Sequence, residues 1–504
     1  MTSAIDLKPN HLDIVERILA EHVPGLEVRA FGSRAAWTAR DYSDVDLAIV
    51  GDGPLHWRTL SRLREAFEES RLPMRVDVLD WHAISEGFRA TIKSDCVVLQ
   101  EPASRADWRQ TNVGDFAWFN YGKSLPARDR VESGTIPVFG SGGITGYHDA
   151  ALTDGPTVII GRKGTVGAVY YSPGPCWPID TTFFLTGSDP DLLRFKYYQF
   201  KALNLDAMNA DTAVPGLNRD AAHAIEIRVP HDAEQRAIAR VLGTLDDKIE
   251  LNRRLCETLA EMARALFRSW FVDFDPVRAK AEGRPSGLPT DLDALFPDSF
   301  VDSELGEIPA GWEVKTMGDV ARERRESVRP DLLAPRTPYI GLDHMPRRSI
   351  ALSQWGTPEG LVSNKSRFDD GDILFGKLRP YFHKVGVASV EGICSTDIVV
   401  LKPDSSRWFG FVLGHASSDE FVDYTDAIAT GTRMPRTKWK DMARYALALP
   451  DESVASAFNE LIRRWVTRMA ALVHQSRVLA AQRDTLLPRL VSGDVRVGIS
   501  KTWK

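Results

Sequence analysis

Three aspartates near the N-terminus have the type and spacing needed for metal-assisted phosphoryl transfer. Asp44 and Asp46 lie in the expected strand 43–50, and Asp77 lies in the expected strand 74–79. Because side chains alternate along a strand, Asp44 and Asp46 share one face, which Asp77 can join from a neighbouring strand. Three such carboxylates are suited to hold divalent cations that clamp the phosphates of a nucleotide. The alternative interpretation is that these aspartates are merely solvated strand ends.

A glycine and a serine precede these carboxylates. Gly32 and Ser33 directly follow the expected strand 27–31. The glycine lets the backbone approach a phosphate closely, and the Ser33 hydroxyl and neighbouring N–H groups can donate to it. Helices expected at 12–22 and 57–69 complete an alternation of helices and strands that would position the site.

The order Gly32-Ser33, Asp44-x-Asp46 and Asp77 resembles the signature of the minimal nucleotidyltransferases of the DNA polymerase beta superfamily. The resemblance implies that residues 1–100 form a nucleotidyltransferase-like α/β domain. The three aspartates would be its catalytic and metal-binding residues, and Gly32 and Ser33 would bind the nucleotide. Its cofactor would be Mg²⁺ and its substrate a nucleoside triphosphate. A domain that has lost activity and serves only as a protein contact is the alternative.

From Trp108 onward the chain repeats itself, which indicates an internal duplication. Six segments recur in the same order, namely 108–115 and 312–319, 137–140 and 338–341, 158–164 and 372–379, 180–185 and 397–401, 212–215 and 432–435, and 224–230 and 445–450. Each copy is rich in short β-like runs broken by glycine and proline. We therefore expect two compact α/β units of related fold with exposed loops.

Basic and aromatic residues gather at corresponding places in the two copies. Arginine and lysine on loops can bind phosphates or read guanine edges. Any one of them alone is more simply explained as a solvated loop residue, but their recurrence in both copies favours DNA contact. The candidate DNA-binding residues are Arg162, Lys163 and Tyr170 in the first copy, and Lys377, Arg379, Tyr381, Lys384, Arg433, Arg436 and Lys438 in the second.

A long helix is expected after each copy. In residues 232–280, apolar side chains recur at three- and four-residue steps over about four heptads, which is typical of coiled-coil packing. This seam comprises Ile238, Val241, Leu242, Leu245, Ile249, Leu255, Leu259, Met262 and Leu266. Asn252 falls within it, where a polar side chain usually fixes register. The second helix, over 452–490, has a face of Val454, Phe458, Leu461, Ile462, Trp465, Met469, Leu472, Leu479 and Leu486.

Residues 108–497 resemble the specificity (S) subunits of type I restriction-modification systems. The most characteristic motifs are the runs 269–280, 307–314 and 486–496. The resemblance implies two target-recognition domains that each read one half of a bipartite, asymmetric site in double-stranded DNA. The two helices would pack as an antiparallel coiled coil and set the spacing between the half-sites. The partners would be methyltransferase subunits, two for each S subunit, together with restriction subunits.

The expected fold class is a multidomain, mixed α/β protein. Its parts are a nucleotidyltransferase-like domain at 1–100, a first recognition domain at 107–231, a central spacer helix at 232–280, a linker at 281–306, a second recognition domain at 307–450 and a C-terminal spacer helix at 451–497. Trp270, Phe271 and Phe274, at the end of the central helix, could contact a methyltransferase subunit or pack locally.

The composition limits the class of protein. The net charge of −6 gives no global signature of nucleic-acid binding, although local basic patches make phosphate contacts regardless of the total. Four scattered cysteines without metal-ligand spacing favour a reducing cytoplasm. Since no apolar run approaches the roughly 18 residues that a membrane span needs, we expect no membrane partner.

Residues 108–497 contain no methyltransferase, Walker or nuclease motif that would support catalysis. We therefore expect the specificity part to need no cofactor and to leave methylation and cleavage to partner chains, in a defence system against phage. The alternative function is a metal-dependent nucleotidyltransferase, antitoxin-like or regulatory, that the recognition domains deliver to its target.

Overall fold

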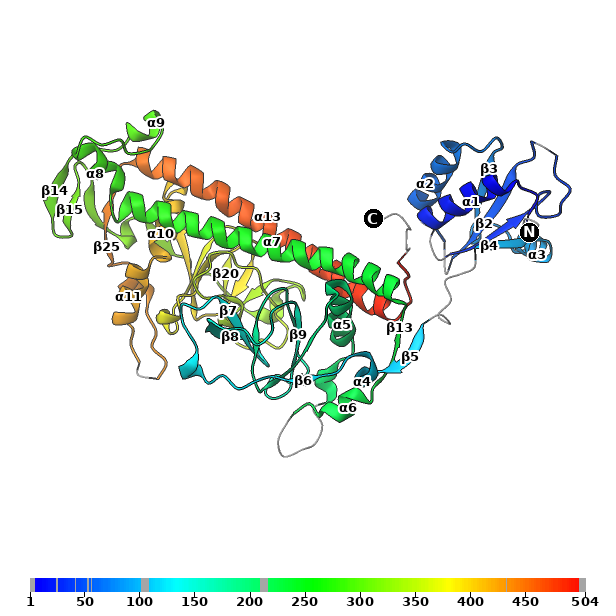
Figure 1. Cartoon of the computed structure of the whole chain (residues 1–504). Coiled ribbons are helices and arrows are strands. Elements are labelled where there is room, and N and C mark those ends of the chain that lie inside the picture. Colours follow the sequence, from blue (N-terminus) through cyan, green and yellow to red (C-terminus); the bar gives the residue numbers. More distant parts are fainter. Residues whose placement is uncertain are drawn as a thin grey trace. The chain divides into compact units, whose positions relative to one another are not determined.

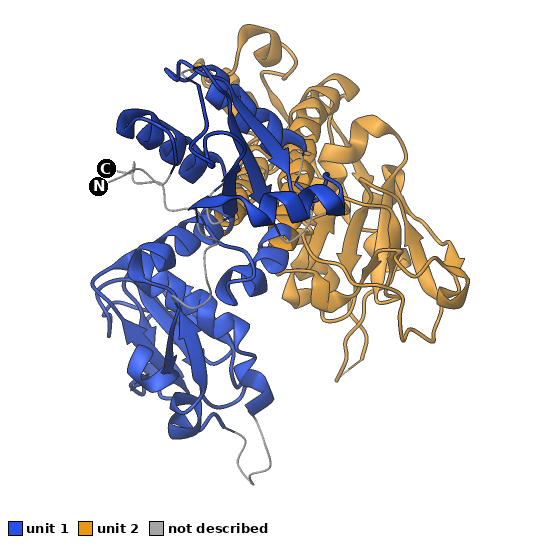
Figure 2. Ribbon diagram, turned by 90° about the vertical axis from the view of Figure 1, so that its right-hand side faces the viewer, with its two compact units in different colours: residues 1–245, 482–504 blue, residues 246–481 orange. Residues whose placement is uncertain are grey.

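The computed structural model describes residues 5–23, 26–40, 42–51, 54–55, 57–100, 108–208, 216–431 and 433–497. It divides into two compact units, which are coloured separately in Figure 2. Unit 1 comprises residues 1–245 and 482–504, and unit 2 comprises residues 246–481. The predicted boundary between residues 100 and 107, and the repeat segments at 212–215 and Thr432, lie outside the described residues.

The N-terminal part of unit 1 is a four-stranded sheet with helices on both faces (Figure 1). The strand order is β3-β2-β1-β4, with β2 and β3 parallel and β1 antiparallel to both β2 and β4. Its elements are α1 (Pro9–His22), β1 (Glu27–Phe31), β2 (Val45–Val50), α2 (Trp57–Glu68), β3 (Val76–Asp80), α3 (Glu86–Ser94) and β4 (Val97–Gln100).

The alternation of side chains in β2 explains why both faces of this sheet are covered. Val45 and Leu47 point into a core that also contains buried residues of α1 and α2. Ala48 points to the opposite face, where it packs with Trp81 and with Ile92 of α3. The polar Asp46 interrupts this second face, because it lies one residue from Leu47 and two from Ala48.

The first repeat copy, residues 108–231, occupies the rest of unit 1. Its strands are β5 (Arg109–Asn112), β6 (Asn120–Tyr121), β7 (Ile136–Gly140), β8 (Gly143–His148), β9 (Thr157–Gly161), β10 (Val169–Ser172), β11 (Trp177–Pro178), β12 (Thr182–Thr186) and β13 (Glu226–Val229). Its helices are α4 (Val113–Phe116), α5 (Pro190–Ala202) and α6 (Arg219–His223). The buried strand β9 and helix α5 both contribute aromatic and aliphatic residues to its core.

The second copy, residues 307–450, lies in unit 2, where the helices α8 (Asp275–Ala281) and α9 (Thr290–Asp293) and the strand β14 (Phe300–Ser303) precede it. Its strands are β15 (Gly306–Pro309), β16 (Glu313–Thr316), β17 (Ala321–Glu323), β18 (Ser327–Val328), β19 (Tyr339–Ile340), β20 (Lys365–Phe368), β21 (Ile373–Gly376), β22 (Val385–Val387), β23 (Gly392–Cys394), β24 (Ile398–Pro403) and β25 (Ala446–Leu449). Its helices are α10 (Phe409–Ala416), α11 (Asp419–Ala427) and α12 (Trp439–Met442).

The two copies share a topology, which confirms the duplication inferred from sequence. The sheet β10-β9-β12-β6 of the first copy corresponds to β22-β21-β24-β17 of the second, and all its neighbouring strands are antiparallel. A second sheet contains one parallel pair in each copy, β7 with β11 and β19 with β23. Antiparallel pairs, β5 with β13 and β16 with β25, close each copy just before its long helix.

Two helices of 40 residues each follow the copies, α7 (Asp232–Phe271) and α13 (Glu452–Val491). Within unit 2 they are antiparallel, since residue numbers rise along α7 as those of their contacts fall along α13. The Asn252 amide donates to the Gln475 side chain at 2.9 Å, and Trp270 packs on Phe458 with ring centroids 5.7 Å apart. Asn252 is fully buried, as its predicted place in the seam requires.

The buried face of α7 within unit 2 differs from the predicted seam. Leu255 and Met262 are 37% and 45% exposed, while Cys256, Ala260 and Ala263 are buried. The sequence pattern favoured the large apolar residues. Small residues, however, let two helix backbones approach closely. The Cys256 thiol of α7 accordingly contacts the Met469 carbonyl of α13 at 3.8 Å. The face predicted for α13 is correct at Val454, Phe458, Ile462, Met469 and Leu472, which are all buried.

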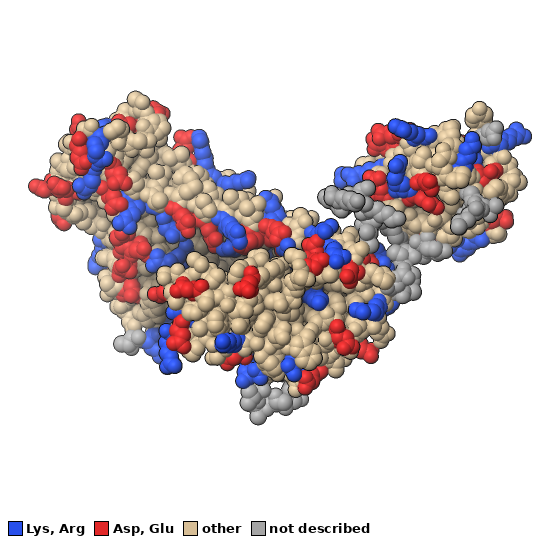
Figure 3. Space-filling view, viewed as in Figure 1, with Lys and Arg blue, Asp and Glu red and all other residues tan. Residues whose placement is uncertain are grey.

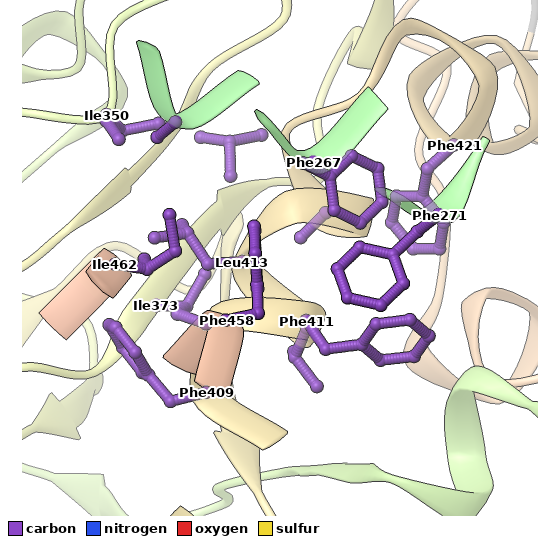
Figure 4. Close-up of a cluster of buried hydrophobic side chains, with 14 of the residues drawn as sticks. Phe267, Phe271, Ile350, Ile373, Phe409, Phe411, Leu413, Phe421, Phe458 and Ile462 are labelled. Carbon is purple, nitrogen blue, oxygen red and sulfur yellow. The ribbon is translucent and has the colours of Figure 1, made fainter. Parts of the chain in front are cut away.

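The single helix expected to reach Lys280 is two helices. Helix α7 ends at Phe271, and α8 begins after Phe274, whose left-handed backbone (φ 53°) is incompatible with a continuous helix. Trp270, Phe271 and Phe274 are buried in the core of unit 2, where Phe267 and Phe271 lie near Phe411 and Phe458 (Figure 4). Local packing is therefore the correct interpretation of these aromatic residues.

A buried ion pair joins distant parts of the sequence within unit 1. Glu234, in the first turn of α7, accepts two hydrogen bonds from the Arg496 guanidinium, at 2.5 and 2.7 Å. The indole of Trp108, at the start of the first copy, also donates to Glu234, at 3.3 Å. Since the Glu234 side chain is only 5% exposed, its charge depends on these donors.

The predicted fold class, mixed α/β with two long helices, is confirmed. Among the residues that the structure describes, no helix combines the length and the apolar character that a membrane crossing requires.

Candidate functional site

The carboxylates predicted to do chemistry lie side by side across the N-terminal sheet. Asp46 on β2 is opposite Asp77 on the parallel strand β3, so both side chains point to the same face. Asp44 lies two residues before Asp46, just ahead of β2. The structure therefore places Asp46 and Asp77 side by side, with Asp44 near enough for its charge to act on Asp46.

The turn that follows β1 requires glycine. Gly32 has φ +74°, and a Cβ atom at this position would lie 2.5 Å from the Asp46 Oδ2 atom. Any side chain here would displace the carboxylate. The main chain of the Gly32-Ser33 turn therefore lies against Asp46, as the predicted binding of a phosphate by this turn would require.

Arg34 holds this turn in place. Its side chain is 5% exposed and donates to the Ser43 carbonyl at 2.8 Å and to the Asp6 carbonyl at 2.7 Å. The first of these bonds fixes the segment that enters Asp44. Arg34 was absent from the sequence prediction, because an arginine after Gly-Ser gives no sign of which carbonyl groups it will reach.

The carboxylates Asp46 and Asp77 line a cleft of about 670 Å³. Arg75, also in the lining, forms an ion pair with Asp77 at 2.9 Å, and Arg64 donates to the Val78 carbonyl at 2.8 Å. Both arginines are thus engaged at the β3 edge. The cleft lies on the same sheet edge as the Gly32-Ser33 turn and is large enough for a nucleotide.

The fold disfavours the ionised form of the Asp46 carboxyl. Partial burial raises the pKa of its carboxyl, and the neighbouring charges of Asp77 and Asp44 raise it further. Within the described residues no three His, Cys, Asp or Glu side chains are close enough to form a ready-made metal site. The residues nevertheless fit a divalent cation, because a cation beside Asp46 would relieve both causes of the shift.

In the first copy, two of the three predicted DNA-binding residues are available at the surface. Arg162 and Lys163 directly follow β9, and the Lys163 side chain is exposed. Tyr170 on β10 instead faces inward, since its hydroxyl donates to the Ser141 carbonyl at 3.4 Å and burial raises its pKa.

A stack of arginines and aromatic rings surrounds Arg162. The Arg219 guanidinium carbon lies 4.9 Å from the ring centroid of Trp118 and 5.0 Å from that of Tyr121. The Arg162 guanidinium carbon also lies 5.0 Å from the Tyr121 centroid, so both arginines share this ring. Trp118 is 58% exposed and Tyr121 is 49% exposed. The sequence prediction missed Trp118, Tyr121 and Arg219, because about a hundred residues separate the aromatic residues from Arg219.

In the second copy, backbone hydrogen bonds bring the two predicted basic loops together. The Arg379 amide donates to the Pro435 carbonyl at 2.8 Å, and the Thr437 amide donates to the Lys377 carbonyl at 3.1 Å. Tyr381, Arg433 and Lys438 are exposed on these loops.

Two predicted residues of this second cluster have partners of their own. Arg436 is ion-paired with Asp397 at 2.9 Å. The Lys384 ammonium donates to the Leu342 carbonyl, and burial, followed by the nearby charge of Arg347, lowers its pKa. Arg347 is exposed and lies 4.2 Å from the Phe382 ring centroid, so it extends the cluster although the sequence prediction missed it.

The exposed residues Leu251, Leu255 and Met262 form an apolar stripe on α7 within unit 2. Their spacing of four and seven residues places them on one face of the helix. Acidic and basic side chains are interspersed over the face of the molecule that Figure 3 shows. The net charge of −6 therefore gives no indication of local basic clusters.

Two family models match the sequence. The family described as "Polymerase beta, Nucleotidyltransferase" matches residues 15–104, and the family described as "Type I restriction modification DNA specificity domain" matches residues 105–261. The two matches are adjacent and cover different parts of unit 1 and the first part of α7.

Curated relatives divide in the same way. A probable protein adenylyltransferase, MntA of Haemophilus influenzae, is 50% identical over 97 residues, which cover 19% of this chain and 85% of the relative. The type I restriction enzyme MjaIX specificity subunit of Methanocaldococcus jannaschii is 25% identical over 360 residues, which cover 68% of this chain and 78% of the relative. A solved S subunit of a type I restriction-modification system from M. genitalium aligns at 16% identity and a TM-score of 0.47, covering 76% of this chain and 96% of its own.

Replacing Asp46 by asparagine should stabilise the N-terminal sheet at neutral pH. The folded-state pKa of Asp46 is raised, so its ionised form opposes folding above the usual pKa of 3.8, and this cost vanishes as pH falls below that value. Amide hydrogen exchange of β2 in the full chain should therefore be slower in Asp46→Asn than in wild type at pH 7. The difference should disappear near pH 4 after correction for intrinsic rates.

The control is Asp13→Asn, which removes an exposed carboxylate from α1. Equal stabilisation by Asp46→Asn at both pH values would contradict the electrostatic explanation, because a pH-independent gain would come from packing.

Proposed function

We propose that this chain directs a type I restriction-modification complex to a bipartite, asymmetric site in chromosomal DNA in the cytoplasm. Its similarity to the specificity subunits of such systems supports this proposal, and its N-terminal part matches the polymerase beta nucleotidyltransferase family. The domain boundaries expected from the sequence are part of this proposal. The shared topology of the two copies carries it, since two related domains with different loops are suited to read two different half-sites.

In the first copy, the DNA-binding surface is the stack of Trp118, Arg219, Tyr121 and Arg162, with Lys163 beside it. Aromatic stacking holds the guanidinium planes but does not neutralise them, so their N–H groups can still donate to phosphates or guanine edges. Arg219 has one carboxylate close by, Asp220, at 3.6 Å, and that side chain is 87% exposed.

In the second copy, the surface consists of Lys377, Arg379, Tyr381, Arg433 and Lys438, extended by Arg347. Arg436 and Lys384 also fix these loops, through Asp397 and the Leu342 carbonyl, and their remaining N–H groups can still reach DNA. Tyr170 has the same supporting role in the first copy.

The two 40-residue helices separate the recognition domains and recruit the methyltransferase subunits, two for each chain, and through them the restriction subunits. The exposed stripe of Leu251, Leu255 and Met262 supports an apolar contact with such a partner. The adjoining face of α7 carries the arginines and glutamates that keep the free helix hydrated.

The N-terminal domain transfers a nucleotidyl group from a nucleoside triphosphate to a protein and so regulates the system; the bond between the α- and β-phosphates breaks and pyrophosphate leaves. Bound Mg²⁺ would neutralise the phosphates and polarise the bond that breaks. Asp46 and Asp44 would hold the metal, with Asp77 as the third carboxylate, and the Gly32-Ser33 turn would orient the phosphates. The 50% identity to a probable protein adenylyltransferase supports a protein acceptor.

Deleting this gene should remove adenine methylation at a split, asymmetric motif in the native host. Wild-type chain and Arg128→Ala should restore the methylation, whereas the double variant Arg162→Ala, Arg219→Ala should not. Each base or phosphate contact contributes enough that losing both weakens DNA binding by at least roughly tenfold. Arg128 is a suitable control because it is 86% exposed and lies beside Asp129.

Genome-wide mapping of methylated adenine makes this comparison. A methylation pattern that does not change on deletion would contradict the specificity-subunit proposal. Full restoration by the double variant would contradict only the assignment of the stack as DNA-binding.

Charging the stripe on α7 should weaken recruitment of the methyltransferase. In Leu255→Lys with Met262→Lys, two buried ammonium groups would oppose an apolar interface, so the amount of methyltransferase that co-purifies should fall roughly tenfold or more. The control Glu261→Lys changes the net charge equally at an exposed position more than 90° around the helix. Co-purification reduced equally by both variants would indicate a charge effect and not an interface.

Asp44→Ala with Asp46→Ala should abolish nucleotidyl transfer while leaving DNA methylation intact. The complex purified from its host would be incubated with Mg²⁺ and a nucleoside triphosphate labelled at the α-phosphate, and labelled proteins would be separated by gel. Wild type should label a protein and the double variant should not. Loss of the methylation motif in the folded double variant would show that the two activities depend on each other.

A further inference from the structure

The cleft beside Asp46 and Asp77 contains an aromatic pair to which the chemistry above gives no role. Phe31 and Phe88 both line it. Phe31 is the last residue of β1 and is paired with Asp46 across the sheet, as Asp46 is paired with Asp77. Residues directly opposite on neighbouring strands point to the same face, so Phe31, Asp46 and Asp77 form one row across three strands.

Phe88 reaches this row from the helix that covers the face. Helix α3 begins after Ser85, whose hydroxyl accepts a hydrogen bond from the Phe88 amide at 3.3 Å. One turn later, Ile92 is buried against Trp81 and Ala48. Residues four apart share a helix face, so the packing of Ile92 aims Phe88 toward the sheet while leaving it 41% exposed.

The two rings are arranged edge to face. Their centroids are 5.8 Å apart and their planes meet at 88°. Whichever ring presents its edge in this geometry, at least one face of Phe88 is not covered by Phe31. A partly exposed phenylalanine in a cleft that also holds Asp46 and Asp77 is therefore an apolar surface next to the proposed phosphate and metal site.

We propose that Phe88, buttressed by Phe31, is the stacking surface for the base of the nucleoside triphosphate. The inference rests on the nucleotidyl transfer proposed above and adds the base subsite to it. Two arginines of the lining already have partners within it, Arg75 with Asp77 and Arg64 with the Val78 carbonyl. Binding by stacking on a ring accepts any base and favours the larger purines, so ATP and GTP bind alike and both bind more tightly than UTP.

Calorimetric titration of the full chain with Mg²⁺ separates base binding from phosphate binding. One ligand is a non-hydrolysable ATP analogue, which carries base and phosphates, and the other is inorganic tripolyphosphate, which carries phosphates alone. Phe88→Ala should weaken binding of the ATP analogue roughly 5- to 150-fold and leave that of tripolyphosphate unchanged. Phe88→Trp should retain or strengthen binding of the analogue.

The matched control is Trp57→Ala, which removes a 67% exposed aromatic ring of the same domain that does not line the cleft. The base subsite alone is overturned if Phe88→Ala binds the ATP analogue as tightly as wild type does. It is also overturned if Phe88→Ala weakens binding of the analogue and of tripolyphosphate together. Wild-type chain that binds neither ligand in the presence of Mg²⁺ overturns the nucleotidyl-transfer proposal, and the base subsite with it.

Discussion

The antiparallel packing of α7 and α13 is the constraint on which the architecture depends. A 40-residue amphipathic helix cannot keep its apolar face from water alone, so each helix needs the other along its length. The first turns of α7 and the last turns of α13 share the core of unit 1, and the remainder of each helix shares that of unit 2. Each recognition region ends in an antiparallel strand pair that leads directly into one of these helices. The Glu234–Arg496 ion pair then ties the start of α7 to the residues after α13.

The N-terminal site depends on a different constraint, the cost of ionising a partly buried carboxylate beside two others. Folding places Asp46 beside Asp77 and near Asp44, and its burial, followed by those neighbouring charges, raises its pKa. Sites that concentrate like charge are destabilising unless a ligand compensates, and they persist where function uses them. The Gly32 turn is a second constrained feature of this site. Its positive φ brings the main chain against the Asp46 carboxylate and leaves no room for a side chain. Both features fit a domain built for a metal and a triphosphate.

Sequence reasoning succeeded where local patterns determine the structure. The strand β2, the duplicated topology and the two long helices followed from periodicity and internal repetition. It failed where three-dimensional context decides. Cys256, Ala260 and Ala263 gave a weaker hydrophobic signal than Leu255 and Met262, yet close backbone approach selects the small residues. The stack of Arg219 on Trp118 and Tyr121 unites residues far apart in sequence, and the inward hydrogen bond of Lys384 depends on a carbonyl that no motif identifies.

The two copies hold their arginines by partly different means, and this difference bears on the DNA site proposed for them. In the first copy, the rings of Trp118 and Tyr121 hold Arg162 and Arg219. In the second, Phe382 contacts Arg347 and Arg379, but a carboxylate holds Arg436 and the loop backbone also holds Arg379. Both arrangements rest on equivalent strands, since Arg162 follows β9 and Lys377 follows β21. A common scaffold therefore presents two chemically distinct surfaces. On the proposal that each copy reads one half-site, two identical surfaces would read two identical half-sites, whereas surfaces that differ in this way favour two unlike ones.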